Sequence, residues 1–285
     1  MRDMDMPKPL HPLVALVNYD KDQISGDFTG KRFMIDFYKI AFKKDFSGQM
    51  RYGQAWYDFS EGGMAFLAPN QVVTMSGEVS CLDGYLLLFH ADLIRNYALG
   101  QRIQQYGFFS YAVNEALFLS DKEKKVIGGI FENIADELDN NTDAFSQDVL
   151  VTQIELLLNY SNRFYNRQFL TRKTIHHDLI TEMNKYLESR FTDPQGGIPT
   201  VPEVAAQLQV SPRYLTDMLR SLTGQSAQQH IHDRLIEKAK VALSTTRQTV
   251  AEIAYQLGFE HPQSFNKLFK RHTNLSPNVF RKSFN

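Results

Sequence analysis

Residues 249–257 read Thr-Val-Ala-Glu-Ile-Ala-Tyr-Gln-Leu, and residues 200–208 read Thr-Val-Pro-Glu-Val-Ala-Ala-Gln-Leu, nearly the same sequence 49 positions earlier. Both stretches open with Thr-x-x-Glu, the pattern of a capping box. In a capping box the threonine hydroxyl and the glutamate carboxylate each bind a free backbone amide at the start of a helix. The repeat therefore predicts two copies of one structural unit, each beginning with a capped helix.

A second helix is predicted in each copy. Short turns at 209–211 and 258–261 lead to a proline, a residue that is tolerated in the first turn of a helix. The core-facing positions of the second helix match between the copies: Leu215 with Phe265, Leu219 with Phe269 and Leu222 with His272. A capped helix, a tight turn and a second amphipathic helix form the helix-turn-helix pattern, which we predict at 200–222 and 249–272.

The polar face of each second helix carries side chains that recognise DNA bases, because Arg and Lys bind guanine and Asn and Gln bind adenine in the major groove. The candidates for base contacts are Arg213, Tyr214, Thr216, Asp217, Arg220, Gln263, Ser264, Asn266 and Lys267. Phosphate contacts position a protein without reading the sequence, and the candidates for them are Ser211, Thr249, Lys270, Arg271, Arg281 and Lys282. The alternative is a plain helical bundle whose polar faces are only solvated.

One helix is predicted between the two units, from residue 227 to about 244, with Ile231, Leu235, Ala239 and Ala242 on one face. At 1.5 Å per residue this linker helix would be about 27 Å long. A strut of that length suits two recognition helices placed about one turn of DNA apart, ~34 Å. One chain would then read two adjacent segments of the major groove.

The two halves of the chain differ in charge. Residues 171–285 contain 15 Lys and Arg against 10 Asp and Glu, a net charge of +5, whereas residues 1–170 contain 16 against 22, a net charge of −6. A basic segment suits a polyanionic partner. Because a typical domain has about 100–200 residues, the chain length predicts two domains, 1–170 and 171–285.

The first domain is predicted to combine an antiparallel β-barrel or sandwich with helices. From about residue 10 to 118, short apolar runs alternate with turn signals. From about 121 to 168, apolar residues recur at helical spacing. One stripe of residues has the spacing of a coiled coil. It consists of Leu150, Ile154, Leu157, Ser161 and Phe164. This stripe either covers the barrel or belongs to a dimerisation helix. The predicted fold class is α+β, with an all-α second domain.

About residues 172–283 resemble the AraC/XylS family of transcription regulators. The resemblance is carried by Val250-Ala-Glu-Ile-Ala-Tyr-Gln-Leu-Gly-Phe259, followed by Ser264-Phe265, Phe269-Lys270 and Ser276-Pro277. Two residues depart from the family pattern. Asp217 stands where many relatives have an arginine or glutamine that contacts a base, and Pro262 stands where relatives often have a polar residue.

The first domain also resembles that of the family, less specifically. Residues 63–71, Gly-Met-Ala-Phe-Leu-Ala-Pro-Asn-Gln, resemble a stretch common in its cupin-like barrels, and residues 156–169 resemble the helix that leads into its DNA-binding domain. The resemblance implies a cupin-like antiparallel β-barrel that senses a small effector and dimerises. The candidates for an effector pocket, which alternatively fill the barrel interior, are Phe37, Tyr38, Trp56, Tyr57 and Phe66.

Enzymatic and metal chemistry is not expected. The β-rich segment has only His11 and His90, which do not form the His-x-His and Glu cluster of metal-dependent cupin enzymes. His230 and His232 are two positions apart, whereas metal-binding pairs on a helix are about four apart. Cys81 is the only cysteine, which excludes an intrachain disulfide. It is expected to be a small buried hydrophobe, with a redox-sensing thiol as the alternative.

The sequence thus predicts a sequence-specific DNA-binding transcription regulator, an activator that is not an enzyme and needs no cofactor or metal. The expected partners are double-stranded DNA, a second copy of the chain and a small effector, and the family resemblance adds RNA polymerase. Neither an apolar leader nor a membrane-spanning stretch is found, so a cytoplasmic location is expected. The alternatives are a constitutive DNA-binding regulator whose barrel only dimerises and a cupin-type enzyme.

Overall fold

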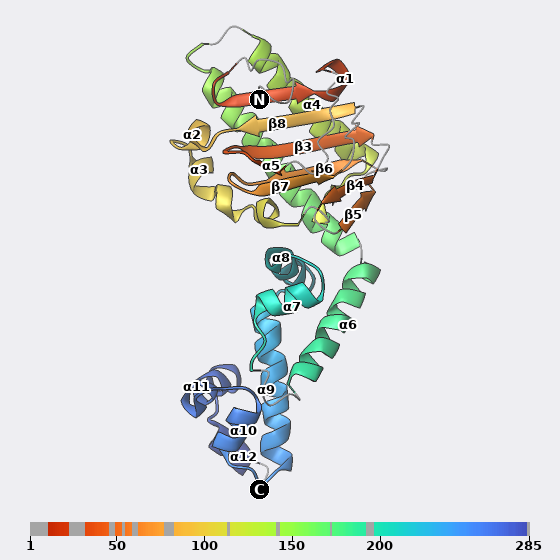
Figure 1. The fold of residues 1–285 in the computed structure, drawn as a ribbon. Helices are drawn as coiled ribbons and strands as arrows, with labels where there is room; N and C mark the ends of the chain where they lie inside the picture. Colours follow the sequence, from red (N-terminus) through yellow and green to blue (C-terminus); the bar gives the residue numbers. More distant parts are fainter. Residues whose placement is uncertain are drawn as a thin grey trace. The chain divides into compact units, whose positions relative to one another are not determined.

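Figure 1 shows the fold of the chain, which divides into two units, Met1–Gln168 and Phe169–Asn285. This computed structural model describes residues 11–22, 32–45, 49–52, 55–58, 62–76, 83–112, 115–140, 143–171, 173–191 and 197–283. Cys81 and the side chains of Trp56 and Tyr57 lie outside the described part of the chain, so the expectations for them are untested.

The apolar runs of the first unit form short antiparallel strands, as predicted. They are β1 (Val14–Asn18), β2 (Arg32–Met34), β3 (Tyr38–Asp45), β4 (Gln49–Tyr52), β5 (Ala55–Asp58), β6 (Gly63–Leu67), β7 (Val72–Ser76), β8 (Asp83–Phe89) and β9 (Leu117–Phe118). One sheet has the order β1-β8-β3-β6-β9, and the other has the order β2-β7-β4-β5. In the centre of the first sheet, Ile40 of β3 lies opposite both Phe66 of β6 and Leu87 of β8.

The described strands form two open sheets, and the predicted closed barrel is not confirmed. In the first sheet β1 pairs with β8 and β9 pairs with β6, which leaves each of them at an edge among the described strands. A closed barrel requires its edge strands to pair with each other. The sequence pattern of short strands and turns is the same for a barrel and for two open sheets, so it could not decide between them.

Helices complete the first unit. They are α1 (Tyr19–Asp22), α2 (Ala91–Ile94), α3 (Ala98–Arg102), the 3-10 turns η2 (Ile103–Gln105) and η3 (Gly107–Ser110), α4 (Asp121–Asp139) and α5 (Ser146–Thr171). The ring of Phe131 on α4 stacks on Phe42 of β3 and Tyr85 of β8, with centroids 5.7 and 5.2 Å apart. On α5, the Ser161 hydroxyl lies 3.8 Å from the sulfur of Met64. Both helices therefore pack on the same face of the five-stranded sheet.

The predicted stripe of α5 is buried in the core of its own unit. All five of its residues are buried: Leu150, Ile154, Leu157, Ser161 and Phe164. Burial within one chain is what the sheet-covering interpretation requires. The stripe is thus not the exposed seam of a dimerisation helix.

The second unit is helical, as predicted. After the end of α5 it contains α6 (Lys173–Arg190), α7 (Val201–Gln207), α8 (Pro212–Thr223), α9 (Ala227–Thr245), α10 (Val250–Gln256), α11 (Pro262–Thr273) and α12 (Pro277–Lys282). The linker helix α9 packs against α8, α10, α11 and α12 (Figure 1). Its buried face contains Ile231, Leu235 and Ala239 as predicted, whereas Leu243 rather than Ala242 completes it.

None of the described helices is both long and apolar enough to span a bilayer.

Candidate DNA-binding interface

Both predicted capping boxes are present. The backbone amide of Thr200 donates to Glu203 Oε2 at 2.7 Å, and the amide of Thr249 donates to Glu252 Oε2 at 2.6 Å. In return, the amides of Glu203 and Glu252 donate to the two threonine hydroxyls, at 3.4 and 3.2 Å. The hydrogen bond from each threonine amide holds the pKa of the glutamate below its ordinary value.

The turns of the two units begin in the same way, although the second turn is one residue longer. The amide of Val210 donates to the carbonyl of Ala205, and the amide of Phe259 donates to the carbonyl of Ala254, both at 3.0 Å. The preceding residue is left-handed in each copy, with φ of 57° at Gln209 and 87° at Gly258. The repeat in sequence is therefore a repeat in backbone structure: α7–turn–α8 and α10–turn–α11 are two helix-turn-helix units.

The second helix of each unit is anchored by the apolar positions that the sequence matched. Leu215 and Leu219 of α8 and Phe265 and Phe269 of α11 are all fully buried. In the second helix-turn-helix unit, the Phe265 ring packs against Phe259 and Phe269, with centroids 5.4 and 5.6 Å apart. This anchoring determines which side chains remain outside.

Helix α11 exposes all its predicted DNA-contacting side chains: Gln263, Ser264, Asn266, Lys267, Lys270 and Arg271. Helix α8 exposes fewer of them. Arg213 and Arg220 are exposed, whereas Thr216 and Asp217 are half-buried. The guanidinium Nε of Arg213 donates to Asp217 Oδ2 at 2.9 Å, so a carboxylate accompanies the first arginine of this helix.

Tyr214 does not face outward, and the prediction that it contacts bases is wrong. Its side chain is only 8% exposed, its ring packs against Phe169, and its hydroxyl lies 3.3 Å from Nε2 of His176. Tyr214 and Met218 lie four positions apart beside Leu215 and therefore extend the buried face of α8. That spacing was visible in the sequence, but the residues that cover Tyr214 lie outside α8, so the helix alone could not show that the position is buried.

Three candidates for phosphate contacts have structural roles within the protein. The sequence predicted such a role for Thr249 but not for Arg281 or Ser211. Arg281 donates from Nε to the carbonyl of Leu243 at 3.2 Å, in the last turn of α9. Its Nη2 atom is also buried, so Arg281 is held against α9 rather than directed to solvent. The hydroxyls of Ser211 and Thr249 accept hydrogen bonds at the N-termini of α8 and α10. Lys282 is exposed.

Polar side chains gather where both units meet the linker helix. Asp233 of α9 accepts from Gln225 Nε2 at 2.9 Å and lies 3.1 Å from Nδ1 of His272. The ring of His272 is perpendicular to that of His232, with centroids 5.8 Å apart. His230 lies 2.8 Å from the hydroxyl of Thr223. Among the described residues, no group of three metal-ligating side chains is arranged to hold a metal ion.

The environment of two of these histidines predicts that the stability of the domain depends on pH. Burial lowers the pKa of His230 and of His232, and the pKa of His232 is lowered further by His272 and Arg271. As the pH falls below about 6.5, the unfolded chain therefore takes up protons before the folded chain does. We expect the melting temperature of the wild type to decrease as the pH is lowered from about 7.5 to 5.5. In His232→Gln the decrease should be smaller.

Thermal unfolding at the two pH values measures this effect. The matched control is His177→Gln, which removes an exposed histidine on α6. An identical fall in His232→Gln and wild type would contradict the assignment.

The described candidates for an effector pocket are packed against neighbouring rings. Phe66 is 4% exposed, and its ring centroid lies 4.3 Å from that of Phe108 and 6.1 Å from that of Tyr165. Tyr38 stacks on Phe89 at 5.0 Å, and Phe37 meets His90 edge-on at 5.2 Å. Because Phe37 and Tyr38 are half-buried, both the effector pocket and the alternative that the aromatics fill the interior stay predictions.

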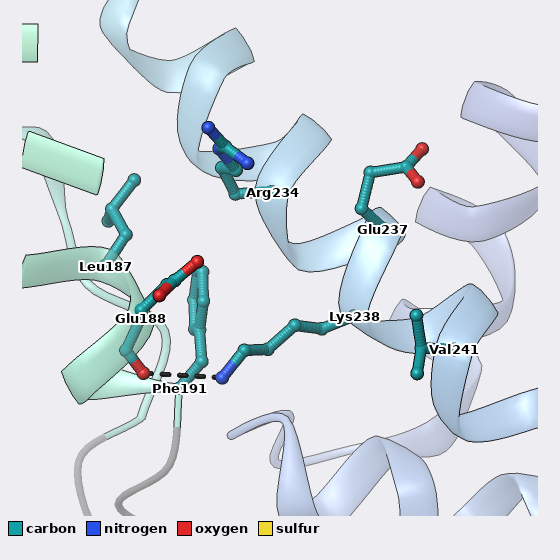
Figure 2. A pocket seen from close by; sticks show the side chains of 7 residues that line it. All are labelled: Leu187, Glu188, Phe191, Arg234, Glu237, Lys238 and Val241. Atoms are coloured by element: carbon teal, nitrogen blue, oxygen red, sulfur yellow. Dashed lines mark hydrogen bonds between the residues drawn. The ribbon is translucent and has the colours of Figure 1, made fainter. Parts of the chain in front are cut away.

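A pocket lies between α6 and α9 (Figure 2). Nζ of Lys238 donates to the carbonyl of Glu188 at 3.3 Å and lies 5.8 Å from the ring centroid of Phe191. The sequence analysis missed this pocket because two segments far apart in the chain form it. The residues that line it are Leu187, Glu188, Phe191, Arg234, Glu237, Lys238 and Val241.

Comparison with known proteins agrees with the geometry. A family described as "Helix-turn-helix domain" matches residues 204–283. The arabinose operon regulatory protein of Escherichia coli is 31% identical over 102 residues, which are 36% of this chain and 34% of that protein. The regulatory protein SoxS of Salmonella typhimurium is 27% identical over 106 residues, 37% of this chain and 95% of that protein. The activator RhaS of Salmonella schwarzengrund is 25% identical over 181 residues, 63% and 60% of the two chains.

The second unit of this chain therefore has the double helix-turn-helix fold. More specifically, it carries a helix-turn-helix domain of the AraC family. The matched segment spans about a third of the length of the arabinose regulator and somewhat under two thirds of RhaS.

Proposed function

We propose that this chain is an AraC-type transcription regulator that binds specific double-stranded DNA with α8 and α11 in adjacent segments of the major groove. The observation that carries the proposal is the pair of units with the same caps and the same turn hydrogen bonds, joined by α9. Two similar units on one rigid helix suit a periodic ligand such as a duplex. Two of the relatives, an arabinose operon regulatory protein and the transcriptional activator RhaS, support the same proposal.

The charges of the second unit also support DNA as the ligand. Its segment from 171 to 285 has a net charge of +5. Helix α11 exposes Lys267, Lys270 and Arg271 together with the amides of Gln263 and Asn266. We assign base contacts to Asn266 and Lys267 and phosphate contacts to Lys270 and Arg271.

Helix α8 contributes less to phosphate attraction in this proposal. The carboxylate of Asp217 lies against Arg213 and offsets part of its charge. The same contact orients the guanidinium, and an oriented side chain loses less entropy when it binds a base. Arg213 is therefore proposed to read sequence rather than to supply general affinity.

Replacing Lys267 by alanine tests the base-reading role. We expect the Kd for the selected DNA site to rise about 5- to 150-fold, corresponding to ~1–3 kcal/mol, while the Kd for unrelated duplex changes little. Fluorescence anisotropy titrations with both duplexes at one salt concentration measure this difference.

The matched control for this titration is Lys122→Ala, which also removes an exposed lysine but lies on α4 in the first unit. It should change neither Kd. If Lys267→Ala weakened both duplexes equally, Lys267 would be a phosphate contact and the assignment to bases would be wrong.

We further propose that the first unit dimerises and responds to a small effector, and that the regulator activates transcription through RNA polymerase. The exposed side of α5 supports dimerisation, because Val149 and Leu156 are 39% and 41% exposed and lie seven positions apart. Sedimentation of the full chain tests the dimer. An effector at 100 times its Kd should add about 2.7 kcal/mol to stability, which a thermal shift screen detects. A chain that shows no shift and binds DNA without ligand would be the constitutive alternative.

A further inference from the structure

Asp233 connects both helix-turn-helix units to the linker helix. Its Oδ2 accepts from Gln225, which follows the C-terminal cap of α8, and its Oδ1 lies 3.1 Å from His272 in the last turn of α11. We propose that Asp233 is a positioning residue that fixes the angle and distance between α8 and α11. This inference rests on the proposed function, because the quantity it controls is the spacing between the two DNA segments that one chain reads.

The internal repeat singles out these contacts as a feature of the junction rather than of each unit. His272 occupies the position at which the first copy has Leu222, and Gln225 occupies the position at which the second copy has Leu275. Each copy thus departs from the other at the residue that reaches Asp233. Asp233 itself lies on α9, outside both copies.

Directional contacts can determine an angle that apolar packing leaves adjustable. The buried face of α9, formed by Ile231, Leu235 and Ala239, holds the two units through non-directional contacts. Hydrogen bonds to a carboxylate require a narrow range of distances and angles. One carboxylate that contacts the last turn of α11 and the residue after the cap of α8 therefore restricts how far one helix can tilt relative to the other.

The exposure of Asp233 separates this role from a role in folding. Its side chain is 41% exposed, and exposed ion pairs contribute little to stability. Its loss should therefore leave the domain folded while the angle between the units becomes less restricted. A readout of spacing detects such a change, whereas a readout of stability does not.

The experiment uses the full chain and a series of duplexes. Selection from random duplex DNA first identifies the two-box site, and variants of that site then carry one or two base pairs more or fewer between the boxes. The wild type should bind the selected spacing best and lose affinity steeply on both sides. For Asp233→Ala, we expect the affinity for the site with the selected spacing to fall about threefold. The further loss of affinity when the spacing is changed should be about threefold smaller than in the wild type.

Two further variants complete the test. Glu237→Ala removes another acidic residue from α9, one that pairs with Lys240, and should keep the wild-type spacing profile. His272→Leu places the residue of the first copy in the second and should reproduce the profile of Asp233→Ala. It also decides the outcome if Asp233→Ala does not fold.

The outcomes distinguish this inference from the proposed function. If the wild type has a sharp optimum and Asp233→Ala and His272→Leu lose the same factor at every spacing, the positioning role is overturned and DNA binding stands. If the wild type selects no duplex sequence, the proposed function is overturned and the positioning role with it.

Discussion

Replacing Phe269 by alanine is expected to unfold the second helix-turn-helix unit under conditions in which the first unit of the chain stays folded. Phe269 is fully buried, and its ring packs against Phe265 and Phe280 with centroids 5.6 and 5.4 Å apart. It therefore ties α11 to α12 as well as to its own unit. Removal of a buried phenylalanine ring costs about 3–5 kcal/mol, a large part of the stability of a small domain.

Hydrogen exchange followed by mass spectrometry measures this effect segment by segment, which matters because a chain with two units need not unfold in one step. In Phe269→Ala, peptides from α10 to α12 should exchange faster, and those from α4 should keep their wild-type rates. The matched control is Phe269→Leu, which installs the residue that the repeat has at Leu219 and should cost about 1.5 kcal/mol or less. Unchanged exchange in α11 would show that the ring does not hold the helix.

The second unit could be predicted in detail because its signals are local. A capping box, a proline in the first turn and an apolar face all lie within a few residues of each other, and the repeat supplied each signal twice. The structure confirms the caps at Thr200 and Thr249, the helices and the buried phenylalanines. These features needed no knowledge of what other segments do.

The errors in the candidate interface come from contacts between distant segments. Tyr214 is buried by its contacts with Phe169 and His176, which lie about 40 residues earlier in the chain. Arg281 is held by a carbonyl of α9, and Asp233 gains its role only because Gln225 and His272 meet it. A helical face predicted from one helix alone cannot include partners that come from another helix.

The first unit was predicted more coarsely for a similar reason. Apolar runs identified the strands, and the stripe from Leu150 to Phe164 identified a buried helix face. Whether two sheets close depends on hydrogen bonds between strands far apart in sequence, and alternation of residues does not encode that. The stripe also shows that apolar residues with coiled-coil spacing can pack on a sheet as well as on another helix.

Replacing Gly258 by alanine is expected to destabilise the second helix-turn-helix unit by about 2–4 kcal/mol through two separate effects. The φ of Gly258 is 87°, a left-handed value that costs a residue with a Cβ about 1–2 kcal/mol. In addition, a Cβ at this position would lie 2.7 Å from the carbonyl carbon of Gly197 and 2.9 Å from the amide nitrogen of Ile198. Both of these are backbone atoms, so no side chain can move away to relieve the contact.

The first helix-turn-helix unit provides the matched control for Gly258→Ala, because Gln209 occupies the equivalent turn position. Gln209 is also left-handed, with φ of 57°, and already accommodates a Cβ. Gln209→Ala should therefore change stability by less than about 1 kcal/mol, and the difference between the two alanine variants measures the sum of the two costs of a Cβ at Gly258, the left-handed backbone and the close approach of the segment at Gly197. Thermal unfolding and hydrogen exchange of α10 and α11 measure both. If the two substitutions changed stability equally, neither the left-handed φ nor the approach of Gly197 would carry a cost, and the turn of the second helix-turn-helix unit would not depend on glycine.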